Sequence, residues 1–195
     1  MKKLLKSCAM ALCFCLLFAL VGCGGAGKQG QSTLRIYNWG DYIDPDVLQQ
    51  FEDENPDIHV VYDTFDSNES MLAKMDGGVQ YDILVPSDYM IEKLIAEDRL
   101  AELDLSKIEN YANINDSFKS PAYDPENKYS IPYMWGTLGI LYNTSMVNET
   151  VDSWNILWND AYKGQIIMYD SSRDSMAVAL RKLGYSVNTK NDSEI

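Results

Sequence analysis

Strand-like and helix-like patterns of apolar residues alternate along the first half of the chain. Short apolar runs typical of buried strands lie at 33–38, 58–64 and 82–85. Each run is followed by a helical repeat, and these repeats begin at Pro45 and after the turn residues Ser67 and Ser87. This β-α-β-α-β-α order predicts an α/β fold with a mostly parallel sheet and helices on both of its faces.

The pattern loosens in the second half of the chain. Residues 103–127 are polar and are expected to form short helical turns and loops. Residues 129–134 are expected to be extended, at the edge of a sheet or crossing it, because Pro132 cannot donate to a central ladder. Residues 136–143 are apolar and predict a further strand.

The last part of the sequence starts a second α/β unit without completing it. A short helix is expected at 153–158 and a buried strand at 165–169, before a helix that Ser171 or Ser172 caps and Gly184 ends. A single β-α unit cannot bury its apolar faces. We therefore expect the sequence to be a fragment of a longer protein; the alternative is a small one-domain protein with a flexible C-terminus.

The first 23 residues read as an export segment. Three lysines precede an apolar run at 9–21, and the residues Leu-Val-Gly-Cys at 20–23 resemble the lipobox of bacterial lipoproteins. That resemblance implies a signal peptide at 1–22, cleavage before Cys23, and a lipid on the Cys23 thiol. A Gly/Gln/Ser-rich tether at 23–32 follows. The alternative is an uncleaved transmembrane anchor, for which the apolar run is short.

The net charge of the chain limits the classes of partner that it is expected to bind. The formal net charge is −13. Cleavage before Cys23 removes three lysines of the 16 basic residues, which leaves 13 against 29 acids and a formal charge of −16. Such a charge argues against nucleic acid and anionic membrane surfaces as partners. All four cysteines lie in the first 23 residues, so no disulfide framework is expected downstream.

The first strand ends in the sequence Asn-Trp-Gly-Asp-Tyr at 38–42. Trp39, Asp41 and Tyr42 therefore stand on a strand-to-helix turn, which is where open α/β sheets bind ligands. Two aromatic faces and a carboxylate suit a ligand that is cationic and partly apolar. The alternative is a packed tryptophan beside an ordinary acidic loop.

Two further strand ends carry similar groups. Ser87, Asp88 and Tyr89 follow the third strand, and residues 170–174 (Asp-Ser-Ser-Arg-Asp) follow the strand expected at 165–169. Carboxylates already occupy these helix starts, and Arg173 is the only base among the three turns. A cation with ammonium groups fits them better than an anion. The alternative is that serine and aspartate here only cap helices, and Ser87 is expected to be a cap first and a ligand contact second.

The sequence offers little support for catalysis. His59, the only histidine, lies within the second strand and is expected at an edge or surface position. No nucleophile elbow, phosphate loop or metal-ligand spacing appears. We expect a binding protein without a cofactor rather than an enzyme.

Five segments together resemble the spermidine/putrescine-binding proteins of bacterial polyamine ABC transporters. They are IYNWGDYI, VVYDTFDSNESMLAKM, YDILVPSDYMIEKL, YSIPYMWGTLGILYN and YKGQIIMYDSSRDSMAVALRKLGYS. The resemblance runs from about Thr33 to the end of the sequence. It implies a two-lobed periplasmic-binding-protein fold of type II, with a first α/β lobe at 33–141 and the start of a second, incomplete lobe at 142–195.

The resemblance also implies a set of ligand-binding residues. Trp39 and Tyr42 would wall the methylenes of a polyamine, and Asp41 would meet one ammonium group. Ser87 would add a hydroxyl contact and Tyr89 another wall. The second lobe would add Asp174 to grip an ammonium. This sequence departs from the family at three positions: Gly40 where serine or threonine is frequent, Ser171 where some spermidine binders have aspartate, and Asp174, which is one methylene shorter than the family's glutamate.

By this resemblance the chain is expected to be a lipid-anchored monomer in the periplasm or on the outer face of the cell membrane. Its lobes would close on spermidine or putrescine about a hinge at 139–143, and the closed form would dock on an ABC permease. The alternatives are the same fold binding a sugar, amino acid or metal, a surface enzyme with its catalytic residues in the missing part, and a lipoprotein that binds no small ligand.

Overall fold

The computed structural model describes residues 30–195, so the expected signal peptide, Cys23 and most of the tether lie outside the described residues. The described part divides into two compact units. The first comprises residues 30–64 and Gln80–Leu84, and the second comprises Phe65–Val79 and Val85–Ile195.

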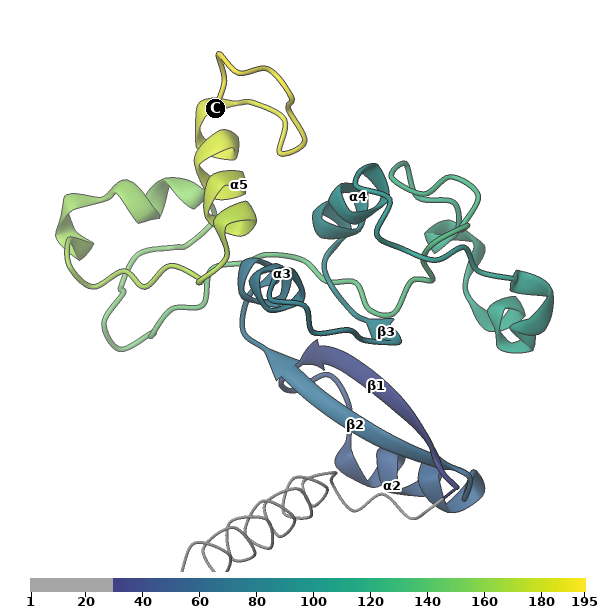
Figure 1. The fold of residues 1–195 in the computed structure, drawn as a ribbon. Coiled ribbons are helices and arrows are strands. Elements are labelled where there is room, and N and C mark those ends of the chain that lie inside the picture. Colours follow the sequence, from purple (N-terminus) through teal and green to yellow (C-terminus); the bar gives the residue numbers. More distant parts are fainter. Residues whose placement is uncertain (1–29) are drawn as a thin grey trace, which may run out of the picture. The chain divides into compact units, whose positions relative to one another are not determined.

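The first unit is built on a three-stranded sheet (Figure 1). Its strands are β1 (Ser32–Trp39), β2 (Ile58–Phe65) and β3 (Ile83–Leu84), in the order β2-β1-β3. β1 pairs with β3 in parallel, with Ile36 opposite Ile83. The three strands and the parallel pairing confirm the α/β fold that the alternating pattern predicts.

Helix α2 (Pro45–Glu54) follows β1, with the bounds that its local signals predict. The carboxylate of Asp44 accepts a hydrogen bond from the backbone N–H of Asp46 at 2.9 Å, and Pro45 occupies the first turn, where no N–H partner is lost. Glu52 ties the helix to β2, since its carboxylate accepts from the Val60 N–H at 2.6 Å and lies 2.9 Å from Nδ1 of His59. His59 is exposed, as predicted.

The second unit contains three α-helices, α3 (Asn68–Asp76), α4 (Asp88–Ala96) and α5 (Ser172–Leu183). Their apolar faces supply most of its core, which includes Met71, Met90, Ile91, Leu94, Ala177, Val178 and Leu180. The helix ends follow local chemistry. Ser67 caps α3 with its side chain, and Gly184 ends α5 at φ +83°, a conformation that glycine adopts without strain.

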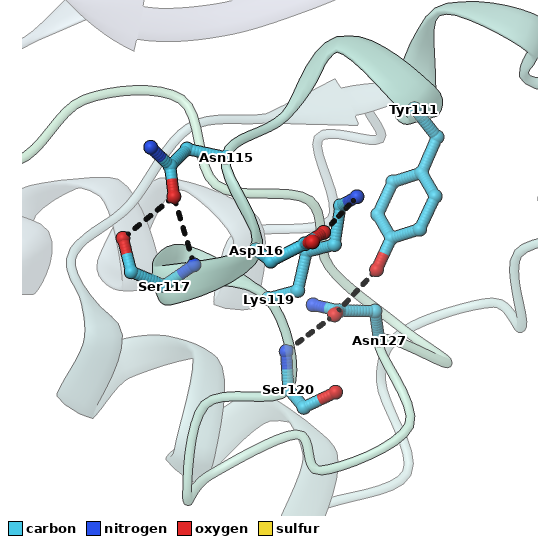
Figure 2. Close-up of polar contacts among 7 residues, drawn as sticks. All are labelled: Tyr111, Asn115, Asp116, Ser117, Lys119, Ser120 and Asn127. Atoms are coloured by element: carbon cyan, nitrogen blue, oxygen red, sulfur yellow. Dashed lines mark hydrogen bonds and ion pairs between the residues drawn. The ribbon is translucent and has the colours of Figure 1, made fainter.

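Buried polar residues organise the segment after α4. This segment is polar, as predicted, and forms the short 3₁₀ helices Leu105–Lys107, Glu109–Asn113 and Asp116–Phe118. Asn127 is fully buried, and its side-chain oxygen accepts from the Tyr111 hydroxyl and from the Ser120 N–H, both at 2.7 Å (Figure 2). Asp124 nearby accepts from three consecutive backbone N–H groups, those of residues 128–130. These bonds replace a hydrophobic core in holding the loop.

The strands expected at 136–143 and 165–169 are not formed in the described residues, and the extended segment expected at 129–134 joins no sheet. Residues 129–134, 136–143 and 165–169 adopt neither strand nor helix structure. The side chains of Leu141 and Ile167 are almost fully exposed, so the expectation of buried strands here was wrong. A strand forms only where a neighbour pairs with its backbone and another layer covers its apolar side chains.

The helix expected at 153–158 forms as a 3₁₀ helix, Trp154–Trp158, and the Ser153 side chain caps it. Among residues 30–195, no helix combines the length and the apolar character that crossing a membrane requires.

Candidate functional site

The turn after β1 presents two aromatic rings and a carboxylate. The ring centroids of Trp39 and Tyr42 lie 5.9 Å apart with planes tilted by 37°. Asp41 and Tyr42 are exposed, and Trp39 is half-buried. Gly40 adds no bulk, and a Cβ built there would meet no atom within 4 Å. The turn thus offers apolar surface beside an accessible negative charge.

Hydrogen bonds fix the backbone of this turn. The buried Asn38 side chain accepts from the Trp39 N–H at 2.8 Å, and the Trp39 carbonyl accepts from the Tyr62 hydroxyl at 3.3 Å. Tyr37, just before the turn, stacks on Tyr81 with centroids 4.4 Å apart. Side chains of the first unit therefore hold the backbone segment that carries the Trp39 indole.

The start of α4 holds Ser87 and Tyr89, both in the second unit. Ser87 is the N-cap residue of α4, as expected, but its side chain does not make the capping bond that the residue type predicts. Instead Asn68, at the start of α3, holds both residues. Its Oδ1 accepts from the Ser87 N–H at 3.0 Å, and its Nδ2 donates to the Ser87 hydroxyl at 3.0 Å and to the Tyr89 hydroxyl at 2.9 Å.

An exposed carboxylate, Glu69, lies next to this arrangement. It accepts a hydrogen bond from the Tyr89 hydroxyl and another from the Ser172 hydroxyl, each at 3.0 Å. Burial acts to raise the pKa of Glu69, but bonds from its own N–H, Tyr89 and Ser172 hold that pKa below its ordinary value. Burial, followed by the Glu69 carboxylate, raises the pKa of Tyr89, so its phenol remains protonated.

The start of α5 carries the two remaining residues of the predicted set. Ser171 is the helix cap, since its hydroxyl accepts from the Asp174 N–H at 3.3 Å. Asp174 lies in the first turn and is half-buried. The guanidinium of Arg173 lies over the Tyr89 ring, 5.8 Å from its centroid. Ser172 links this helix start to Glu69, so α3, α4 and α5 contribute to one polar cluster.

The predicted ligand-binding residues thus fall into two groups, one in each unit. The first group is Trp39, Gly40, Asp41 and Tyr42, and the second is Ser87, Tyr89, Ser171 and Asp174. Sequence reasoning missed Asn68, Glu69 and Ser172. Asn68 and Glu69 follow the carboxyl end of β2, so the rule that singled out the other strand ends could have found them. Within residues 30–195, no group of three histidine, cysteine or acidic residues could hold a metal ion.

Comparison with known proteins finds relatives over most of this chain. It is 41% identical over 180 residues to the spermidine/putrescine-binding periplasmic protein of Escherichia coli (strain K12), covering 90% of this chain and 51% of the relative. The solved spermidine/putrescine ABC transporter substrate-binding protein PotD from Streptococcus pneumoniae is 50% identical, with a TM-score of 0.68 over 84% of this chain and 51% of that one.

The solved PotD lipoprotein of Treponema pallidum is 38% identical, with a TM-score of 0.76 over the same shares of the two chains. The chain spans about half the length of these curated relatives. These likenesses confirm the fold class that the sequence predicts.

The sequence profile of one family, described as bacterial extracellular solute-binding protein, matches residues 46–195. This match covers well over half of the chain and includes the second group of site residues. The chain therefore belongs to the family of bacterial extracellular solute-binding proteins.

Proposed function

We propose that this chain is the polyamine-binding first part of a solute-binding protein that delivers spermidine or putrescine to an ABC permease. The observation that carries the proposal is the turn after β1, where the Trp39 and Tyr42 rings adjoin the exposed Asp41 carboxylate. The relatives are named spermidine/putrescine-binding proteins, which supports the same ligand class.

The chemistry of a polyamine matches the groups at these turns. Its methylenes pack on aromatic faces, and its ammonium groups form charge-assisted bonds with carboxylates. In the first unit, Trp39 and Tyr42 are the apolar walls and Asp41 binds an ammonium. The absence of a hydroxyl at Gly40 bears on which polyamine is preferred.

In the second unit, Tyr89 is a further wall and Ser87 a hydroxyl contact. Asp174 binds another ammonium, and Ser171 adds a hydroxyl where an aspartate would add charge. Asp174 is one methylene shorter than the family's glutamate, and together with Ser171 this bears on which polyamine is preferred.

The proposed architecture has two lobes. Residues 33–141 form the first lobe and residues 142–195 begin the second, with 139–143 as the hinge on which the lobes close. The exposed apolar segments 136–143 and 165–169 support this scheme, because they carry strand-like sequence without a partner in the described residues. Their partners would lie in sequence beyond Ile195.

The proposed location is the periplasm or the outer face of the cell membrane. The extracellular family supports export, and a lipoprotein among the relatives supports an anchor. The signal peptide would be residues 1–22, Cys23 would carry the lipid, and 23–32 would tether a monomeric protein. We assign no residue a catalytic role, because the proposed contacts with the ligand are ionic, hydroxyl and apolar contacts only.

The test is a calorimetric titration of the mature protein, including any sequence that continues beyond Ile195. Putrescine and spermidine are the ligands; a sugar and ornithine, which is putrescine with an added carboxylate, are the controls. We expect saturable binding of a polyamine and none of the controls. If neither polyamine binds to folded protein that is shown to be free of ligand, the likeness to the family extends to the fold alone.

A second outcome distinguishes the alternatives. Binding of the sugar or ornithine in place of a polyamine would point to another solute, and turnover of a ligand during the titration would point to an enzyme. No stabilisation by any solute would favour an interaction lipoprotein.

A further inference from the structure

Asn68 is a buried side chain whose hydrogen bonds all lead to the predicted ligand residues. It is 3% exposed, and it contacts the Ser87 N–H, the Ser87 hydroxyl and the Tyr89 hydroxyl at 2.9–3.0 Å. The orientation of its amide is determined by chemistry. A backbone N–H can only donate, so Oδ1 must face Ser87 N, and Nδ2 must face the two hydroxyl oxygens.

This orientation also determines where the Tyr89 proton points. The phenol has one proton, and the Asn68 amide already donates to its oxygen. The neighbouring Glu69 carboxylate is an acceptor without a proton of its own at neutral pH, since its pKa lies below the ordinary value. The Tyr89 proton therefore goes to Glu69, at an oxygen–oxygen distance of 3.0 Å.

The hydroxyl and carboxylate groups of this cluster consequently offer lone pairs to a ligand, beside the Arg173 guanidinium that lies 5.8 Å from the centroid of the Tyr89 ring. The Tyr89 oxygen retains one acceptor site after it accepts from Asn68, and the Glu69 carboxylate retains acceptor capacity after it accepts from Tyr89 and Ser172. Ammonium groups carry three donors and no acceptor, so they fit such a surface. A ligand carboxylate would find the Tyr89 donor already committed.

We propose that Asn68 is a positioning residue that orients Ser87 and Tyr89 and commits the Tyr89 proton to Glu69, so that this subsite presents hydrogen-bond acceptors to an ammonium group. The proposal rests on the polyamine function proposed above and adds to it the residue that determines the polarity of the subsite. Asn68 itself does not touch the ligand.

A double-mutant cycle tests this role in the mature protein with its continuation. Asn68→Ala is expected to weaken putrescine or spermidine binding about tenfold, because it removes the hydrogen bonds that position Ser87 and Tyr89. In the Tyr89→Phe background the same change is expected to weaken binding less than about threefold, because the hydroxyl that Asn68 orients is gone. Asn148→Ala, an exposed amide outside the cluster, is the control and should leave affinity unchanged.

A second readout separates positioning from general damage to the fold. The Asn68 hydrogen bond lowers the pKa of Tyr89, so Asn68→Ala should raise that pKa further, as measured by NMR titration of ¹³C-labelled tyrosine with Tyr89→Phe for assignment. Should Asn68→Ala not fold, Asn68→Ser replaces it in both measurements. An equal loss of affinity in both backgrounds, or an unchanged Tyr89 pKa, overturns the proposal. Failure of the unmutated protein to bind either polyamine overturns the proposed function itself, and this inference with it.

Discussion

The phenol of Tyr89 donates its proton to the carboxylate of Glu69, and the two oxygens lie 3.0 Å apart. This bond joins the starts of α3 and α4, and it helps to hold the pKa of Glu69 below its ordinary value of 4.5. A carboxyl whose folded pKa is lowered stabilises the fold above its unfolded pKa, and this stabilisation is lost as the pH falls through the folded value.

The first prediction follows from this loss of stabilisation at low pH. Tyr89→Phe should raise the pKa of Glu69 towards 4.5, and its cost in free energy of unfolding should be larger at pH 7 than at an acidic pH below the folded pKa of Glu69, where this carboxyl is protonated. Urea unfolding of the complete mature protein at both pH values measures this difference. Tyr185→Phe, at an exposed tyrosine outside the cluster, should show no such dependence on pH. An equal cost of Tyr89→Phe at both pH values would contradict the prediction.

The second prediction concerns the two acids proposed to bind ammonium groups. Asp41→Asn and Asp174→Asn should each weaken spermidine binding at least about tenfold, because each leaves a desolvated ammonium without its carboxylate. Asp53→Asn and Asp192→Asn remove the same charge from exposed positions outside the clusters and serve as controls. Calorimetry on the complete mature protein gives the affinities. Equal losses of spermidine affinity in a variant and its control would show that the effect arises from the overall charge of the protein.

The third prediction uses the space at Gly40. A Cβ added there would meet no atom within 4 Å, and the backbone is not in the left-handed region, so Gly40→Ser should change the free energy of unfolding by less than about 0.5 kcal/mol. The added hydroxyl should nevertheless change the ratio of putrescine to spermidine affinity, which calorimetry on the complete mature protein measures.

The matched control for this change is Gly184→Ser. Gly184 has φ +83°, where a serine is strained, so this variant should lose about 1 kcal/mol without a change in the affinity ratio. Destabilisation of Gly40→Ser to the same extent would show that the turn needs glycine for its backbone.

The fourth prediction concerns Asn127, which is fully buried at φ +47°. Asn127→Ala removes the acceptor of the Tyr111 hydroxyl and the Ser120 N–H and keeps an unfavourable backbone angle, so it should cost about 3 kcal/mol in free energy of unfolding. Asn127→Gly loses the same hydrogen bonds but relieves the backbone, and should cost about 1 kcal/mol less. Denaturant unfolding of the complete mature protein compares the two variants, and equal costs would assign the whole effect to the hydrogen bonds.

The elements that the sequence predicts well are those with a local cause. Asp44 and Pro45 determine where α2 begins, and Ser171 and Gly184 delimit α5, because capping bonds and backbone conformation depend on a few neighbouring residues. The turn after β1 was identified in the same way, from a strand followed by polar and aromatic residues.

What the sequence did not show depends on partners distant in the chain. The side chain of Ser87 has the residue type of a cap, yet Asn68, 19 residues away, engages it. The residues next to Ser67 and Asn68 in the sequence indicate the start of α3, but they do not show that Asn68 also holds the start of α4. The apolar runs around Leu141 and Ile167 report what a segment could bury, but not whether a neighbour is present to cover it.

The fifth prediction tests the origin of those exposed segments. In the chain that ends at Ile195, the amides of 136–142 and 165–169 lack strand partners, so they should exchange with deuterium within seconds, whereas amides of β1 are protected. In a protein of the relatives' length, sheet partners should slow exchange in both segments by orders of magnitude. The shorter chain should also melt without a cooperative transition, since residues 142–195 would form only part of the proposed second lobe. Fast exchange at Leu141 and Ile167 in the longer protein as well would mean that these segments are loops by nature, and the proposed second lobe would have to be built from other strands.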